Sequence, residues 1–216
     1  ERKEQIAHNI GKILEWDEGE ERTFIASIVS TEPVALEGKF APGSYVVSRD
    51  ATPEYVASLI LTRFDETVLS RYTNELRDRV PFEDALTIAS LLEREAYDFT
   101  DMRYISGVIW NRLFIDMHLQ IDATLQYARG AASLRTWWPT PLPKDKYIES
   151  PYNTYDHKGL PPAPIANPSL EAILAALNPR DTDCLYYFHD DEGGFHCTQT
   201  YEEHVALLKK FYGRGR

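Results

Sequence analysis

Hydrophobic residues recur at helical spacing at the start of the chain. Ile6 and Ile10 share one face of a helix expected over residues 4–14, and a second short helix is expected over about 22–30. The helical pattern then stops, because residues 36–47 (LEGKFAPGSYVV) are interrupted by glycine and proline. This segment is expected to be extended.

A third helix is expected from Thr52-Pro53, since threonine can cap a helix and proline suits its first turn. Two further helices are expected over 82–95 and 102–116, where apolar residues again recur at helical spacing. The buried face of the third helix is expected to hold Val56, Leu59, Ile60 and Phe64.

The pattern changes again after these helices. Leu119 and Ile121 alternate in a short extended stretch, which Asp122 is expected to end by capping a helical turn. Residues 131–168 are so rich in proline and aromatic side chains that they predict a long extended loop, and such loops are usually functional. A helix is expected to resume over 169–178.

The C-terminal part predicts a small β component. Segments 184–189 (CLYYFH) and 195–200 (FHCTQT) flank the turn sequence DDEGG and are expected to form a β-hairpin. Thr200 and Glu203 then match a capping box for a last helix. The fold class expected is therefore α+β, a helix-rich domain with a small β component.

Composition and charge exclude several classes of protein. The formal net charge of −11 argues against a nucleic-acid partner, and no apolar run approaches the roughly 20 residues that span a bilayer. Cys184 and Cys197 are too few for a zinc site or a disulfide framework. A hairpin that turns near Glu192 would place Cys184 opposite Thr200, so the two thiols are not expected to pair, and their redox state stays open.

Helix 82–95 carries a carboxylate on its apolar face. At about 100° per residue, Glu95 falls within the apolar stripe, whereas Glu93 lies at its edge and Arg94 points toward solvent. Burial raises the pKa of a carboxyl group toward the range of a general acid, which makes Glu95 a candidate acid/base residue. The alternative is that Glu95 lies where the apolar face frays into solvent. The stripe consists of Ala85, Ile88, Ala89, Leu91 and Leu92.

Five long segments have unusual compositions, and they are ASLLEREA (89–96), ISGVIWNRL (105–113), MHLQIDATLQY (117–127), SPYNTYDHKGLPPAPIANP (150–168) and CLYYF (184–188). They resemble, in the same order, the motifs of the endolytic murein transglycosylases, the YceG-like family. The segment LEGKFAPGSYVV is also similar to the family's segment ahead of the catalytic part. The resemblance implies a YceG-like catalytic domain over 47–216, preceded by the end of an N-terminal region and a connecting segment over 1–46.

The resemblance implies a reaction as well as a fold. It implies cleavage of the β-1,4 bond between N-acetylmuramic acid and N-acetylglucosamine within peptidoglycan strands, without water, leaving a 1,6-anhydromuramoyl end. The catalytic glutamate of the family falls on Glu95. Glu95 would protonate the leaving oxygen and then accept the proton of the muramoyl C6 hydroxyl as that hydroxyl attacks C1. One carboxyl group then suffices, whereas ordinary glycosidases usually need two.

The resemblance also implies the surroundings in which the protein acts. Peptidoglycan strands are the expected partner, and peptidoglycan synthases are candidate partners. The expected location is extracytoplasmic, with a single-pass N-terminal membrane anchor in the full-length protein that is missing from this chain. No metal and no cofactor are expected.

Two motifs supply candidate substrate-binding residues. Gln120, Asp122 and Thr124 would point the same way from an extended segment, where they suit hydrogen bonds to acetamido groups. Asp122 could instead serve as a helix cap, a role that is compatible with substrate binding. The other candidates could line a glycan groove or hold a packed loop, and they are Tyr152, Asn153, Thr154 and Tyr155.

The chain departs from the family pattern at two places. Ala96 stands where the family commonly has a polar residue, and the family's Gly-Gly-His-x-Phe becomes Gly-Gly-Phe-His-Cys, which displaces the histidine to His196. His196 cannot simply replace the family's histidine, because neighbouring residues of a strand face opposite sides. Two rival functions stay open: a glycan-binding scaffold without activity, and a muramidase that uses water with Asp122 as its second carboxylate.

Other polar residues have structural and functional interpretations side by side. Asn111 and Arg112 could reach toward Glu95 or form a surface polar pair. Trp137 and Trp138 could contact glycan or anchor the loop. The metal-ligand types in His189, Asp190, Asp191 and Glu192 are expected to form a solvated turn at the hairpin tip.

Overall fold

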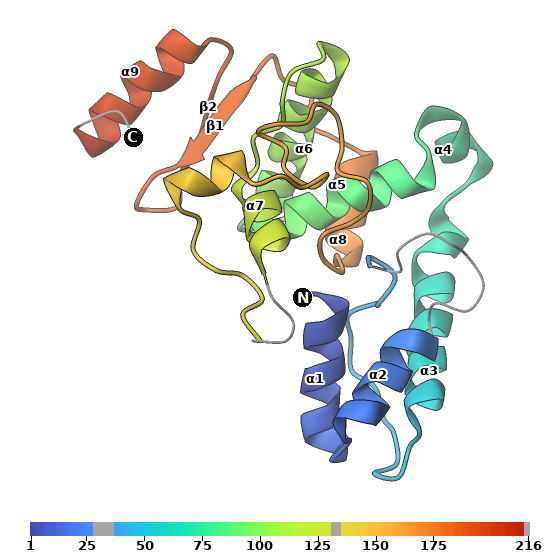
Figure 1. The fold of residues 1–216 in the computed structure, drawn as a ribbon. Helices are drawn as coiled ribbons and strands as arrows, with labels where there is room; N and C mark the ends of the chain where they lie inside the picture. Colours follow the sequence, from blue (N-terminus) through green and yellow to red (C-terminus); the bar gives the residue numbers. More distant parts are fainter. Residues whose placement is uncertain (28–36, 131–134, 214–216) are drawn as a thin grey trace.

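The protein has the helix-rich α+β fold that the sequence predicts (Figure 1). The computed structural model describes residues 1–27, 37–130 and 135–213. Within this part of the chain, no helix is long and apolar enough to cross a membrane. The elements in chain order are α1 (Lys3–Leu14), α2 (Glu18–Ser27), α3 (Pro53–Thr67), η1 (Leu69–Arg71), α4 (Asn74–Arg79), α5 (Phe82–Glu95), α6 (Phe99–Phe114), α7 (Asp122–Arg129), η3 (Pro143–Tyr147), α8 (Leu170–Leu177), β1 (Tyr186–His189), β2 (Phe195–Thr198) and α9 (Tyr201–Tyr212).

Helices α1, α2 and α3 enclose a small core at one end of the molecule (Figure 1). Helix α3 begins as predicted, because the Thr52 side chain accepts a backbone N–H of the first turn and Pro53 follows it. The buried residues of this core are Ala7, Phe24, Phe40, Val56, Ala57 and Ile60.

Helix α5 passes through the larger core, with α6, α7 and α8 in contact with it. Helix α3 contributes to both cores, since Ile60 packs in the small core and Phe64 in the large one. The boundary predicted between residues 46 and 47 stays a prediction. The stripe predicted on α5 is confirmed, because the residues buried in the large core include Ala85, Ile88, Ala89, Leu91 and Leu92.

Helices α2 and α6 begin earlier than predicted. Asp17 and Glu20 cap α2 reciprocally, since each side chain accepts the backbone N–H of the other residue. Asp98 caps α6 by accepting the N–H of Asp101 at 2.9 Å. Residues 28–30, where α2 is expected to continue, lie outside the described residues.

The segment before α7 also differs from prediction. Asp122 does not cap a helical turn, because it is the first helical residue and Ile121 occupies the cap position without a side-chain hydrogen bond. The long loop predicted over 131–168 is largely confirmed, with the short helix η3 inside it. Its residues 131–134 lie outside the described part of the chain.

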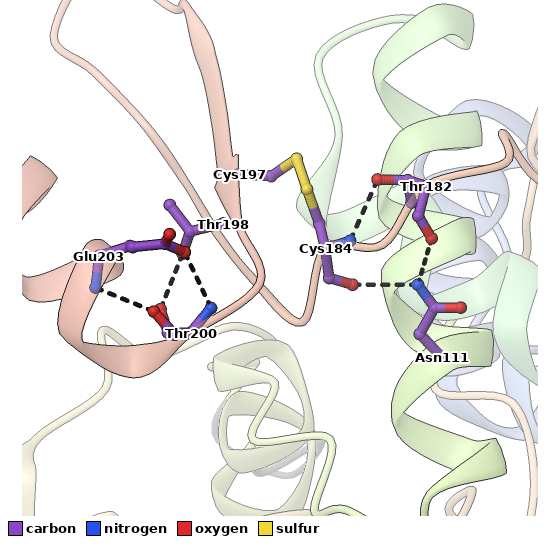
Figure 2. The surroundings of a disulfide bond; sticks show 7 residues. All are labelled: Asn111, Thr182, Cys184, Cys197, Thr198, Thr200 and Glu203. Carbon is purple, nitrogen blue, oxygen red and sulfur yellow. Dashed lines mark hydrogen bonds between the residues drawn. A yellow bond between two sulfur atoms is a disulfide. The ribbon is translucent and has the colours of Figure 1, made fainter.

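The β-hairpin forms as predicted, with Tyr187 opposite Cys197 in an antiparallel pair. Continued outward, this register places Cys184 opposite Thr200, yet Cys184 and Cys197 form a disulfide (Figure 2). The prediction that the thiols do not pair is wrong because β1 begins only at Tyr186, so Cys184 lies outside the ladder. The Cα atoms of the two cysteines are 5.7 Å apart, which suits a disulfide.

Loss of this disulfide is expected to lower the free energy of unfolding by about 2 kcal/mol, because the unfolded chain gains the freedom of an unclosed loop. The expectation is at the low end of the usual range, since a short hairpin can retain contacts when unfolded. Urea unfolding of a Cys184→Ser/Cys197→Ser variant measures the loss. The parent protein under a reductant is the matched control and should show the same loss. Free thiols in the unreduced protein would contradict the pairing.

Candidate active site

Glu95 is the half-buried last residue of α5, and its carboxyl group meets two other elements. Its Oε2 accepts a hydrogen bond from the hydroxyl of Tyr187 on β1 at 2.9 Å. The backbone N–H of Ala123, in the first turn of α7, also faces the carboxyl group. A helix N-terminus favours negative charge, so α7 stabilises the ionised form of Glu95.

Burial dominates the protonation of Glu95. It raises the pKa of the carboxyl group above its ordinary value, and the nearby charge of Asp122 adds to this rise. The hydrogen bond from Tyr187, the N–H of Ala123 and the charge of His189 act in the opposite direction and lower the pKa. The net shift is upward, which is the direction that a general acid requires.

The residues of the QIDAT segment do not share one face. Gln120 and Asp122 are exposed, and Asp122 Oδ1 accepts a hydrogen bond from the hydroxyl of half-buried Tyr155 at 2.6 Å. Thr124, in contrast, is 0% exposed. The prediction that Gln120, Asp122 and Thr124 point the same way is wrong, because α7 begins at Asp122 and turns Thr124 into the core.

Two of the four residues predicted in the YNTY segment are buried as well. Asn153 is 0% exposed and its amide donates to two carbonyl oxygens of the preceding turn. Thr154 is 2% exposed, and its hydroxyl oxygen accepts the N–H of Ile121 at 3.0 Å and lies 2.9 Å from the hydroxyl of Thr124. These side chains attach the loop to the start of α7.

Tyr152, the first residue of the YNTY segment, belongs to an aromatic cluster. The ring of Tyr152 packs on Tyr127 with centroids 4.7 Å apart, and Tyr127 packs against Trp138. The guanidinium of Arg94 lies 4.1 Å from the ring centroid of Trp138, whose indole N–H donates to Gln5. These contacts fit the interpretation of Trp138 as an anchor of the loop. Arg94, predicted to point toward solvent, stacks on the ring of Trp138.

Tyr187 and His189 reach the Glu95 side of the hairpin, and both lie on the same face of β1 because they are two residues apart. The imidazole Nε2 of His189 lies 2.8 Å from Oδ2 of Asp101 on α6. Neither side chain is among the predicted site residues. Alternation along β1 places them together, but no local signal relates this strand to Glu95.

His196 and its neighbour Phe195 are consecutive residues of β2, so they face opposite sides of the hairpin and have different partners. Phe195 pairs with His189 across the hairpin. His196 lies beside Asp190, with Nε2 and Oδ2 2.6 Å apart. His189 and Asp190 therefore have separate partners, and in the described part of the chain no group of three His, Cys, Asp or Glu side chains could hold a metal ion.

Asn111 and Arg112 on α6 bind the segment that leads into β1. The amide of Asn111 donates to the carbonyl oxygens of Thr182 and Cys184 at 2.6 and 3.1 Å (Figure 2). Arg112 donates to the carbonyl oxygen of Leu185 at 2.6 Å. These bonds fix the start of β1 against α6.

Glu37 and Asn167, which belong to two of the motif segments, form a buried contact that does not involve Glu95. Asn167 donates from its amide to Glu37 Oε1 at 2.5 Å, and its Oδ1 accepts the N–H groups of Gly38 and Phe40. Glu37 is 1% exposed, and burial together with the charge of Glu4 raises its pKa to about 7. Glu37 and Asn167 therefore join the segment that precedes α3 to the loop before α8.

The sequence profile of the YceG-like family matches residues 1–210, and the chain belongs to this family. It is 36% identical over 177 residues to the "Endolytic murein transglycosylase" of Bacillus subtilis (strain 168), an alignment that covers 82% of this chain and 48% of that protein. A Streptococcus pneumoniae (strain D39) protein of the same name is 31% identical over 200 residues, with 86% and 36% covered. The chain thus spans less than half the length of these relatives.

The fold also matches a solved structure. A putative YceG-like protein from Listeria monocytogenes superimposes with a TM-score of 0.81 at 29% sequence identity, covering 96% of this chain and 73% of that chain. The arrangement around Glu95 thus lies within a fold shared with this relative.

Proposed function

We propose that the protein is an endolytic lytic transglycosylase that cleaves peptidoglycan strands, with Glu95 as its single acid/base residue. The observation that carries the proposal is the setting of Glu95, whose carboxyl group lies between β1 and the start of α7 and has a pKa raised by burial. The names of the curated relatives support the same reaction.

The reaction proceeds through one carboxyl group in two proton transfers. Protonated Glu95 donates its proton to the glycosidic oxygen, and the bond between that oxygen and C1 of the muramoyl residue breaks. The muramoyl C6 hydroxyl attacks C1 and forms the 1,6-anhydro ring. The carboxylate of Glu95 takes the proton of this hydroxyl, which restores the acid without a second enzyme carboxylate.

The other candidate residues fall into two groups: those proposed to contact the glycan and those proposed to hold the loop in place. Gln120, Asp122, Tyr152 and Tyr155 retain exposed surface and are proposed to contact the glycan. Thr124, Asn153 and Thr154 are buried, with their polar groups bonded inside the protein. They are proposed to act by holding the loop in place.

We propose an extracytoplasmic location with a membrane anchor in the full-length protein, and peptidoglycan synthases as candidate partners. The Cys184–Cys197 disulfide supports the location, because disulfides persist in oxidising compartments.

The products of glycan digestion test the proposed reaction. Mass spectrometry of peptidoglycan strands incubated with the protein is expected to show 1,6-anhydromuramoyl ends, since the C6 hydroxyl replaces water as the nucleophile. Reducing ends would instead show a muramidase, and intact strands would show a binding protein. Digestion in water enriched in oxygen-18 is the internal control, because only a hydrolytic product incorporates the label.

A further inference from the structure

The mechanism proposed above gives no role to the hydroxyl group that touches Glu95. Tyr187 donates from this hydroxyl to Glu95 Oε2 at 2.9 Å. Burial, followed by the charge of Glu95, raises the pKa of Tyr187 well above its ordinary value. The hydroxyl therefore keeps its proton and remains a donor throughout the neutral range.

We propose that Tyr187 is a positioning residue that holds Oε2 of Glu95 and leaves Oε1 to exchange the proton with the glycan. This inference rests on the proposed role of Glu95. A carboxyl group fixed through one oxygen presents the other in a defined direction, which proton transfer requires. The same bond becomes stronger when Glu95 ionises, because charged acceptors make stronger hydrogen bonds than neutral ones.

The surroundings of Tyr187 fix its hydroxyl in place before any substrate binds. Its ring stacks on Phe195 with centroids 5.9 Å apart. Its cross-strand neighbour is Cys197, which the disulfide joins to Cys184. Asn111 binds the carbonyl oxygen of Cys184 from α6 (Figure 2). A donor that is fixed in advance does not have to reorganise during the reaction.

A test of Tyr187 must leave the other ionisable groups around Glu95 unchanged. Replacement of Tyr187 by phenylalanine does so, because it removes one oxygen and keeps the ring. The groups that face Glu95 or its tyrosine are Arg94 on α5, Asp101 and Arg112 on α6, Asp122 on α7, Tyr155 in the loop and His189 on β1.

Tyr187→Phe is expected to lower kcat for strand cleavage about tenfold and to move the alkaline limb of the pH–rate profile upward by about one unit. The limb moves upward because Glu95 loses a bond that stabilises its carboxylate, so it keeps its proton to a higher pH. Tyr186→Phe is the matched control, since Tyr186 lies on the opposite face of β1 and packs on Tyr201. A Tyr187→Phe profile that matches the control would overturn the proposal, because a structural role alone would not move the limb.

A second measurement does not depend on activity. Carbon-13 NMR of glutamate carboxyl groups, with the Glu95 signal assigned by its loss in Glu95→Gln, is expected to show a higher pKa for Glu95 in Tyr187→Phe. An unchanged Glu95 pKa would refute the inference about Tyr187 even if cleavage depends on Glu95. Full cleavage by Glu95→Gln would refute the proposed function instead, so the two failures are distinguishable.

Discussion

Glu95→Gln is expected to lower the rate of strand cleavage about a thousandfold or more, because glutamine cannot donate the proton that the leaving oxygen needs. The same substitution also removes the base that accepts the proton of the C6 hydroxyl. Both proton transfers are lost together because one carboxyl group performs them. The measurement is the rate of release of glycan fragments from purified peptidoglycan.

The fold should survive this substitution. The side-chain oxygen of glutamine can accept the hydroxyl of Tyr187 as Glu95 Oε2 does. Removal of a carboxyl group whose pKa is raised by burial should leave stability at neutral pH no lower than in the parent. Glu93→Gln is the matched control, since Glu93 lies on the same helix and its Oε2 accepts the N–H of Ser169 at 2.9 Å. Equal cleavage rates for the two variants would exclude Glu95 as the acid.

The difference between Glu95 and Tyr187 explains how far the sequence alone could predict the site. Glu95 lies in a continuous helix, where the angle between residues is nearly constant, so its place on the buried face follows from local spacing. Tyr187 meets it from a strand 92 residues further along the chain. No periodicity within either element fixes such a contact, because it depends on how α5 and the hairpin pack.

Local patterns also fail where an element ends. The register of the hairpin is predicted correctly, but the pairing of Cys184 depends on β1 beginning at Tyr186. In the same way, Thr124 is buried because the chain changes from extended to helical at Asp122. A period of two holds only inside a strand, so residues just beyond its end lose their predicted direction.

Some residues of the segments that resemble the family's motifs have structural contacts and lie outside the proposed site. Glu37 and Asn167 belong to two of the segments that carry the resemblance, yet they bind each other and nearby backbone groups. The backbone carbonyl of Glu1 accepts the N–H and the amide of Asn167 as well. Such residues fix where segments meet, and the effect of replacing them should appear in stability before it appears in cleavage.

Glu37→Gln is therefore expected to change how stability depends on pH. The pKa of Glu37 is about 7 in the folded protein and 4.5 as its ordinary value, so the folded state binds the proton more tightly. Stability is lost as the pH rises through this window. Above about pH 7 the buried charge is expected to cost about 3 kcal/mol, which glutamine avoids while it keeps an acceptor for Asn167.

Urea unfolding from about pH 5 to about pH 8 measures this effect as the difference in free energy of unfolding between variant and parent. The difference should be small at the acid end and should grow in favour of Glu37→Gln as the pH rises. Glu149→Gln is the control, because Glu149 is exposed in the loop and should leave the pH dependence unchanged. Parallel curves for Glu37→Gln and the parent would show that Glu37 is not the group that titrates. A pH-dependent gain in stability with unchanged strand cleavage would assign Glu37 to the contact between the segment before α3 and the loop before α8, apart from the chemistry at Glu95.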